Sequence, residues 1–541
     1  MSKHAASVGI DFGTSTTLIA ESVDQSVRTV PIGHSSVWME TLAGRKANLW
    51  VFGAEAEHLP VGDVVRSVKS YITNDGAAPS GGPQLSPDEV DEVIAGVFRA
   101  TAAAARAADL KLDKRLVRLG CPAQWVGAQR GRLARIAHEA GIEAYVDDMV
   151  DEPIAAGVDW IWEQFLAAGR RVRGNVLVID VGGGTVDVAL LQVEFEDVPR
   201  ISVLACRGAA VAGDAVDDEL SYRLREHLAE SRRELASDDD RLLAQYLRRA
   251  ARAAKVRLSS SESARVVLDP PYDHLPAATL TRADLDDALI TPLKAMSLQV
   301  ELTLREANLR AARGNVAAVR DKSMDDLSRD VNHVLLAGGM SQIPAIKERF
   351  RELLPHSAFH PATGDLATTR IVNGFARPNA YSSLNLNRPG MDIVLAWTDQ
   401  WGVEQEEILF PAFQPVYQPY QVLAARPLRY ESPPLRLPIS GRVPGRVFIR
   451  SIGHKVVPLI VEGRTIESFP VTLDGFGGFG MSLDIEGQLN LRENNEVALT
   501  LNIPEWPYVR FSGLNTLAQV HATVPASQFQ TYLHRLDHHH K

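Results

Sequence analysis

Two short stretches of the chain end an apolar run with an aspartate, a glycine turn and a hydroxyl. They are residues 8–14 (VGIDFGT) and residues 177–185 (LVIDVGGGT), which place Asp11 and Asp180 at corresponding positions. Glycines let backbone N–H groups come close to an anion, since no Cβ stands in the way. Mg²⁺ takes one or two carboxylates together with phosphate oxygens and water. These residue types at this spacing predict a site for phosphate groups and magnesium.

A third glycine turn follows the apolar run 333–337. Gly338 and Gly339 come next, and Pro344 lies near the first turn of an expected helix. A glycine turn that opens a helix suits contact with a phosphate or a ribose. Each of the three turns, taken alone, also fits an ordinary tight connection, because glycine is common in turns. The shared plan of the first two turns predicts two matching halves that face each other across a cleft.

The segments that must position these turns alternate between short β-branched runs and runs with helical spacing of apolar residues. The helical spacing is clear in residues 101–110, 222–258 and 284–309. Such alternation predicts α/β layers. From about Asp392 proline becomes frequent and short segments alternate in polarity, as in residues 496–502. This second texture predicts a mostly β module.

These changes of texture predict the domain organisation. We expect an α/β domain at residues 1–388 and a β-rich domain at 397–541. The family resemblance described below implies that the first domain binds a nucleotide, that residues 389–396 are an interdomain linker, and that the second domain binds a substrate or partner. A chain of 541 residues is too long for one compact core, which agrees with more than one domain.

The composition narrows the function classes. The chain carries 57 basic and 67 acidic residues, a net charge of −10, which disfavours nucleic-acid binding. Its two cysteines, Cys121 and Cys206, cannot form a disulfide framework or a four-cysteine zinc site. No secretory signal and no apolar run long enough for a membrane span is recognisable. We therefore expect a cytoplasmic protein that binds neither nucleic acid nor a membrane.

A series of segments in matching order resembles the heat-shock protein 70 (Hsp70) family of the actin, sugar-kinase and heat-shock ATPase superfamily. The segments are residues 9–17, 65–69, 151–156, 179–188, 212–214, 255–261 and 338–344. The resemblance implies an actin-like, bilobed ATPase domain, built of two duplicated ribonuclease-H-like halves and followed by a mostly β domain. It also implies that the cofactors are ATP or ADP with Mg²⁺.

The resemblance implies a role for each matching residue. Asp11 and Asp180 would hold Mg²⁺, and Lys69 would neutralise charge on the γ-phosphate. The catalytic residues would be Lys69, Glu152, Asp180, Thr185 and Asp187. Of these, Glu152, Thr185 and Asp187 would place the attacking water. The nucleotide contacts would be Asp11, Gly13, Thr14, Ser15, Thr16, Gly182, Gly183, Gly184, Thr185, Gly213, Asp214, Lys255, Ser259, Gly338, Gly339, Met340 and Gln342. Hydrolysis by such a site needs positioning and charge stabilisation, without a covalent intermediate.

The adenine side departs from the family pattern. In the family two arginines usually sandwich the adenine, and here Val256 and Gln342 stand at those positions. Arg252 stands where the family has an acidic residue, and Met340 replaces a serine. Because stacking on guanidinium planes is lost, we expect a slow or low-affinity ATPase.

The C-terminal region resembles the family less closely. Residues 455–466 and 481–490 resemble strands of its substrate-binding β-sandwich. No helical lid is expected, since after Pro507 only residues 527–536 have a helical pattern. The loop 475–480 (GFGGFG) matches a dinucleotide-binding pattern by letter, but a strand-like segment follows it where that motif needs a helix.

The function that the resemblance implies is an ATP-hydrolysing chaperone, active in protein folding and the stress response. Its nucleotide state would control the binding of an unfolded or partner polypeptide by the β domain, with possible J-domain and nucleotide-exchange partners. Two alternatives stay open. One is a non-hydrolysing, nucleotide-gated scaffold, and the other is a small-molecule kinase of the same superfamily.

Overall fold

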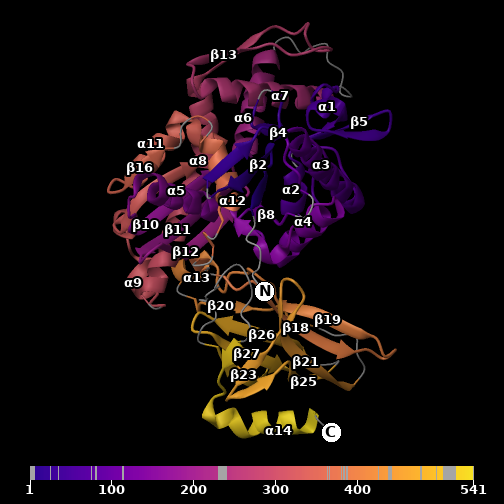
Figure 1. Ribbon diagram of the computed structural model, residues 1–541, viewed down its shortest axis with the longest axis vertical. Helices are drawn as coiled ribbons and strands as arrows, with labels where there is room; N and C mark the ends of the chain where they lie inside the picture. The colour runs from indigo at the N-terminus through magenta and orange to yellow at the C-terminus, as the bar shows by residue number, and fades with distance from the viewer. Residues whose placement is uncertain are drawn as a thin grey trace.

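The computed structural model describes residues 7–539 with short gaps. The gaps are residues 25, 35, 75, 79–81, 113–114, 230–239, 313, 362–363, 365, 379, 382–383, 386–387, 425, 436–440, 475–477, 495 and 504–519. A mixed α/β part comes first, and a mostly β region follows it at one end, as Figure 1 shows.

The first sheet of the α/β part is centred on β1 (Val8–Phe12), whose five residues are all buried. Its other strands are β2 (Thr16–Val23), β3 (Ser26–Val30), β4 (Trp38–Glu40), β8 (Val117–Cys121) and β9 (Val150–Asp151). The order is β3-β2-β1-β8-β9, with β4 on β2. Strand β1 pairs antiparallel with β2 and parallel with β8. The chain between β1 and β2 is the first glycine loop.

The second sheet repeats this order around β10 (Gly174–Val181). Its other strands are β11 (Val186–Phe195), β12 (Pro199–Ala209), β15 (Val331–Ala337), β16 (Ala358–Pro361) and β17 (Leu384–Asn385). The order is β16-β15-β10-β11-β12-β17, and β10 pairs antiparallel with β11 and parallel with β15. The residues of β10 from Val176 onward are buried, which explains their continuous apolar run. The second glycine loop joins β10 to β11.

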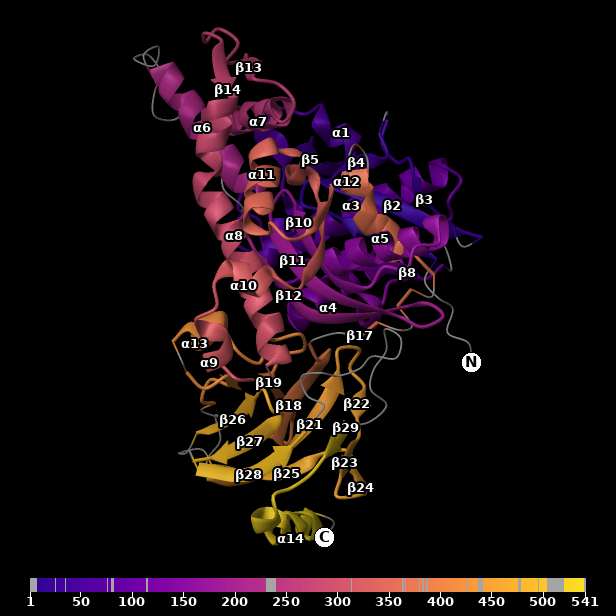
Figure 2. The ribbon, with the colours of Figure 1, turned by 90° about the vertical axis from the view of Figure 1, so that its left-hand side faces the viewer.

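Helices cover both sheets and fill the space between them. They are α1 (Ala54–Glu57), α2 (Val68–Thr73), α3 (Pro87–Ala107), α4 (Gly127–Glu139), α5 (Glu152–Ala168), α6 (Gly213–Ala229), α7 (Asp240–Leu258), α8 (Arg282–Ala311), α9 (Ala317–Arg320), α10 (Met324–Ser328), α11 (Pro344–Leu353) and α12 (Leu366–Ala376). Helix α12 packs on β1 and β2, α5 packs on β10 and β11, and the two helices contact each other. The long α8 lies on the other side of the second sheet, visible in Figure 2.

Two small sheets extend the α/β part at its far end. They are formed by β5 (Ala43–Lys46), β6 (Leu49–Phe52) and β7 (Val64–Val65), and by β13 (Ser263–Val266) with β14 (Ala278–Thr281). Local signals explain where two of the longer helices begin. At α3 the Ser86 hydroxyl accepts a hydrogen bond from the Glu89 amide, and at α8 the Thr281 hydroxyl accepts one from the Asp284 amide.

The β region contains a five-stranded, a four-stranded and a three-stranded sheet among its described residues. Its elements are β18 (Met391–Thr398), β19 (Glu404–Phe410), α13 (Pro419–Leu423), β20 (Arg429–Glu431), β21 (Arg442–Ser451), β22 (Val456–Val457), β23 (Leu459–Val461), β24 (Arg464–Ile466), β25 (Phe469–Asp474), β26 (Phe479–Asp484), β27 (Gln488–Glu493), β28 (Glu496–Asn502), β29 (Val520–Ala522) and α14 (Phe529–His539). The sheets enclose one apolar core, and Tyr532 of α14 is fully buried in it. Helix α14 lies at the outer end of the region (Figure 1).

The structure differs from the linker predicted at 389–396. Residues 391–396 belong to β18, which pairs with β19 on one side and β21 on the other. Ile393 and Leu395 face the main core of the β region, and Val394 and Ala396 pack with Phe448 on the opposite face. An apolar run buried on both faces forms a central strand rather than an open connection. The predicted division into domains at these boundaries stays a prediction.

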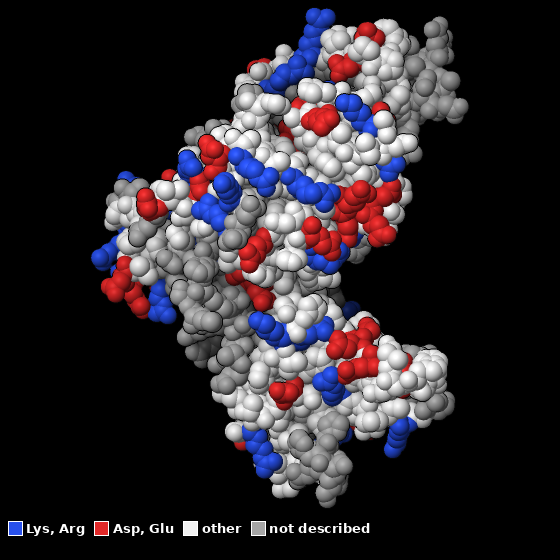
Figure 3. Space-filling view, turned by 45° about the vertical axis from the view of Figure 1, so that its right-hand side comes forward, with Lys and Arg blue, Asp and Glu red and all other residues white. Residues whose placement is uncertain are grey.

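Other predictions for the β region agree with the structure where it describes them. Strand β26 begins at Phe479, within the segment 475–480, so no helix follows that segment; residues 475–477 lie outside the described part. No helix among the described residues is long and apolar enough to cross a bilayer. On the face in Figure 3 acidic and basic side chains are interspersed, and a hollow separates the α/β part from the β region.

Candidate functional site

The two glycine loops form the same turn and pack against each other. The Gly13 amide donates to the Thr16 carbonyl at 3.0 Å, and the Gly182 amide donates to the Thr185 carbonyl at 2.9 Å. A Cβ on Gly183 would lie 2.6 Å from the Ser15 hydroxyl oxygen. Real Cβ atoms do not come within 3 Å of a neighbouring atom, so any larger residue at position 183 would force the Ser15 hydroxyl to move. The loops from the two sheets therefore meet at one place.

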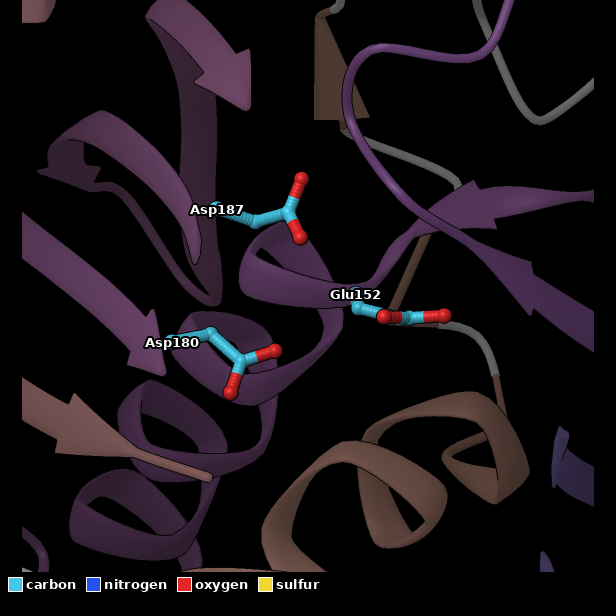
Figure 4. A group of neighbouring side chains, drawn as sticks. All are labelled: Glu152, Asp180 and Asp187. Atoms are coloured by element: carbon cyan, nitrogen blue, oxygen red, sulfur yellow. The ribbon is translucent and has the colours of Figure 1, made fainter. Parts of the chain in front are cut away.

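Three carboxylates converge beside these loops. Asp180 comes from the end of β10, Asp187 from the start of β11 and Glu152 from the first residue of α5. One oxygen of each lies within 4.8 Å of one oxygen of the other two. Figure 4 shows the three side chains pointing into the same space. This spacing is suited to a divalent cation with oxygen ligands.

The carboxylates carry more negative charge than the protein neutralises. One oxygen of Asp180 and one of Asp187 are buried without a hydrogen-bond partner. Burial, followed by repulsion from the neighbouring carboxylates, raises the pKa of Asp180 well above its usual value. Burial and the charge of Glu152 also raise the pKa of Asp187 to about 7. Buried carboxylates without a partner are costly, and a bound cation would stabilise them.

Lys69 and Asp11 complete the charged cluster. The ammonium group of Lys69 forms an ion pair with Glu152, and the Lys69 side chain is 3% exposed. Burial acts to lower the pKa of Lys69, but the charges of Glu152 and Asp11 outweigh it and raise the pKa. Burial, and next the charge of Glu152, raises the pKa of Asp11 to about 7. Lys69, Asp11 and Glu152 are distant in the sequence, but the charge of each shifts the pKa of another member of this cluster.

A second layer of contacts surrounds the loops. The Asp214 amide, in the first turn of α6, donates to the Gly183 carbonyl at 2.6 Å. Lys255 of α7 donates to the Gly213 carbonyl at 3.0 Å and pairs with Asp217 at 2.7 Å. Together these bonds fasten helices α6 and α7 to the second glycine loop.

The third glycine turn also reaches the site. Gly338 has a positive φ of 78°, and a Cβ there would lie 2.4 Å from an oxygen of Asp180. A side chain at this position would be strained by the backbone and would clash with the carboxylate. Glycine is therefore required where the chain turns past Asp180.

Comparison with known proteins decides the family. The model of the family described as Hsp70 protein matches residues 33–368, which is more than half of the chain. This chain belongs to the Hsp70 family. It is also 28% identical over 414 residues to the chaperone protein DnaK of Thermosipho melanesiensis. That match covers 73% of this chain and 62% of the relative, so the chain spans less than two thirds of the relative's length.

The structure of this Hsp70-family chain brings most of the predicted site residues together. The two loops, Lys69, the carboxylates, Gly213, Lys255 and Gly338 are linked by the contacts described above. Met340 instead packs in the apolar core of the second half, where it is 6% exposed. The Ser259 hydroxyl donates back to the Lys255 carbonyl of its own helix at 3.2 Å. Gln342 is half-buried and lies within hydrogen-bond distance of the Ser341 hydroxyl, at 3.3 Å.

The predicted metal pair differs from the cluster in the structure. The sequence pairs Asp180 with Asp11, whereas the structure groups Asp180 with Glu152 and Asp187. Asp11 is coupled to the group through its charge. The two similar glycine turns of the sequence point to Asp11 and Asp180, whereas Glu152 joins the cluster because α5 begins beside the end of β10.

Several residues that bear on the site were missed by sequence reasoning. Asp217 pairs with Lys255, and Ser67, which has a positive φ of 51°, donates to Asp214 at 2.9 Å. Arg130 of α4 pairs with Asp151 at 2.5 Å, and Asp151 is the N-cap residue of α5. Ser67 and Asp151 lie in segments that resemble the family but were given no role, and Arg130 and Asp217 are single polar residues outside those segments.

The β region touches the site through Arg130. Phe413, in the loop after β19, has its ring centroid 3.9 Å from the Arg130 guanidinium carbon. The Gly127 amide at the start of α4 donates to the Ala412 carbonyl at 2.9 Å. Arg130 then holds Asp151, whose neighbour along the chain is Glu152. One line of contacts therefore joins the β region to the carboxylate cluster.

The residues present fit a Mg²⁺-nucleotide. The buried oxygens of Asp180 and Asp187 without partners supply the oxygen ligands, and the glycine loops offer backbone N–H groups to phosphates. Mg²⁺ would be held by Asp180, with Glu152 and Asp187 within reach and Asp11 on the facing loop. A bound Mg²⁺ supplies positive charge that shields the phosphate oxygens and makes phosphorus more electrophilic.

Proposed function

We propose that this chain is an ATP-hydrolysing chaperone whose β region binds an unfolded or partner polypeptide under control of the nucleotide. The observation that carries the proposal is the cluster of Lys69 with three converging carboxylates between two glycine loops. Membership of the Hsp70 family, and a relative named as a chaperone, support this choice over other ATP-binding proteins. The proposal includes the two-lobed arrangement in which each sheet contributes one glycine loop.

The roles of the chain's own residues follow from their positions. Backbone N–H groups of the loops at 13–16 and 182–185 bind phosphate oxygens. Lys69 is buried and cationic, so it stabilises negative charge that develops on the terminal phosphate. Glu152 and Asp187 accept hydrogen bonds from a water molecule and orient it for attack, with the Thr185 hydroxyl beside Asp187.

The coupling between the nucleotide and the β region is proposed to pass through Arg130. Glu152 is the first residue of α5, and its N-cap neighbour Asp151 is held by Arg130. Because Phe413 covers the Arg130 guanidinium, movement of the β region changes how firmly Arg130 holds Asp151. Coupling of this kind requires two states that nucleotide and polypeptide bind unequally.

The adenine side supports weak nucleotide binding. Val256 is 65% exposed, and no arginine stands at its position or at Gln342 to stack on a base. The same feature favours the second candidate, a nucleotide-gated scaffold that does not hydrolyse ATP. A small-molecule kinase is not favoured by a specific observation on the described residues. The cytoplasmic location, the stress response and the J-domain and exchange partners stay predictions.

Isothermal titration calorimetry with ATP and Mg²⁺ tests the nucleotide site. We expect saturable heat at sub-millimolar to millimolar ATP, and loss of the Mg²⁺-dependent part in Asp180→Asn. A matched control is Asp325→Asn, which removes an exposed carboxylate of α10. No heat at near-millimolar ATP, in protein that is folded by circular dichroism, would show the proposal to be wrong.

A further inference from the structure

A pocket rich in arginine lies beside the glycine-loop site. It is a small hollow of about 80 Å³ and lies between the segment that precedes α2 and helices α6 and α7. Its lining includes Arg66, Arg248, Arg249 and Arg252. Arg248 pairs with Asp218 at 2.8 Å and Arg249 lies 3.7 Å from Asp269, so Arg66 and Arg252 are the two lining arginines to consider as ligand-binding groups.

The carboxylates in the pocket wall are already engaged. Asp217 pairs with Lys255 at 2.7 Å, and Asp214 accepts the Ser67 hydroxyl at 2.9 Å. Arg248 pairs with Asp218 at 2.8 Å and lies 3.9 Å from Asp214. Thus the acidic groups of the wall neutralise Lys255 and Arg248.

Arg66 and Arg252 are bonded less closely than the other arginines of the pocket. Within the described part of the chain, neither guanidinium makes a hydrogen bond or an ion pair. Both side chains are half-buried. Burial, followed by the charge of Arg252, lowers the pKa of Arg66 to about 10, which means that the positive charge is disfavoured there. Opposite charges act on the two arginines without forming an ion pair: Glu40 attracts both, Glu57 attracts Arg66 and Asp217 attracts Arg252. Burial raises the pKa of Glu40.

The wall of the pocket is bonded to the second glycine loop. Asp217 lines the pocket and holds Lys255, and Lys255 contacts the Gly213 carbonyl. Asp214, which also lines the pocket, donates its amide to the Gly183 carbonyl at 2.6 Å. Arg66 and Arg252 therefore lie near the place where the loops would bind the phosphates of a nucleotide. Guanidinium groups bind phosphate oxygens in pairs and more strongly than neutral donors do.

We propose that the pocket of Arg66 and Arg252 binds a phosphate group, carried either on the ribose of the bound nucleotide or as a free phosphate anion. The first form rests on the proposed nucleotide site, and the second form does not. In both forms the two arginines select for an extra phosphate, which ATP and ADP themselves do not offer at this position.

Calorimetry on the full chain at low salt tests the proposal. The probes are inorganic phosphate, ADP with Mg²⁺, and ADP that carries an additional phosphate on the 3′-hydroxyl. We expect saturable binding of phosphate, or binding of 3′-phosphorylated ADP about tenfold tighter than ADP. The binding of inorganic phosphate, or the tighter binding of 3′-phosphorylated ADP, should disappear in the double variant Arg66→Gln/Arg252→Gln. It should persist in the control Arg329→Gln, which removes an exposed arginine.

The probes separate the two sources and the two proposals. A gain for 3′-phosphorylated ADP alone supports the ribose phosphate, and arginine-dependent binding of inorganic phosphate alone supports the free anion. If ADP binds equally to wild type and double variant, and no probe gains from the arginines, the pocket proposal is overturned while the nucleotide site stands. If ADP does not bind but phosphate binding depends on the arginines, the nucleotide site fails and the free-anion form holds.

Discussion

Replacement of Phe413 by leucine should uncouple the β region from the nucleotide site. Phe413 is 8% exposed, and its ring covers Arg130, whose side chain is 1% exposed. A desolvated cation–π contact contributes about 2 kcal/mol, which corresponds to roughly thirtyfold in an equilibrium constant. Leucine keeps much of the volume and removes the π face. If the contact between Phe413 and Arg130 forms in only one of the two coupled states, its removal lowers the coupling between nucleotide and polypeptide binding by up to this thirtyfold factor.

The assay is the affinity of a fluorescent unfolded peptide with and without Mg²⁺-ATP. The ratio of the two dissociation constants in the wild type measures the coupling. In Phe413→Leu we expect the ratio to move toward one by about tenfold or more, with basal ATP turnover changed by less than about threefold. Phe413→Tyr keeps the ring and should retain the ratio.

Two results would refute this reasoning. An unchanged ratio in a folded Phe413→Leu protein would mean that the coupling does not pass through Arg130. An equal fall of turnover with and without peptide would mean that Phe413 supports the geometry of the site and not the coupling.

Three further predictions concern charge and packing. Asp180→Asn should raise the melting temperature of the nucleotide-free protein by about 2–4 °C, because the substitution removes a buried carboxylate that its neighbours repel. The variant should also lose the further stabilisation that Mg²⁺-ATP gives the wild type. An unchanged or lower melting temperature of the nucleotide-free variant would contradict the prediction. Gly183→Ala should weaken ATP binding at least tenfold, since its Cβ meets the facing loop at 2.6 Å, whereas Gly131→Ala, with open space in α4, should leave ATP affinity unchanged in the same titration. A ring nitrogen of His333 lies 3.1 Å from a ring nitrogen of His360, and burial lowers the pKa of both side chains. The unfolded chain therefore binds more protons than the folded chain, so stability should fall as the pH drops below about 6.5. Melting curves from pH 8 to pH 5 should show a smaller loss of stability in the double variant His333→Asn/His360→Asn than in the wild type. An equal loss of stability would contradict the assignment of the pH dependence to these two histidines.

The glycine loops could be predicted from the sequence because their signal is local. An apolar strand, an aspartate and a glycine turn are adjacent in the chain, and the structure places Asp11 and Asp180 at the ends of two central strands. The α/β part and the β region could also be predicted, because a strand buried on one face alternates apolar and polar residues and a strand buried on both faces is continuously apolar.

The partners of these residues depend on how distant elements pack. Asp217 meets Lys255 because α6 and α7 lie together, and Arg130 meets Phe413 because the β region packs on α4. No periodicity encodes such pairs. The apolar run 392–396 has the composition of a linker that docks on a surface, but its place between two partner strands is a property of the whole sheet.

The most direct test of the account is ATP turnover with and without an unfolded model peptide, in the wild type and in Lys69→Ala. Removal of the buried ammonium beside Glu152 leaves charge on the terminal phosphate unstabilised, which costs about a hundredfold or more in turnover. We predict slow, Mg²⁺-dependent turnover that the peptide stimulates and that Lys69→Ala abolishes. Tight ATP binding with no turnover in the wild type, or turnover that Lys69→Ala leaves intact, would contradict the account.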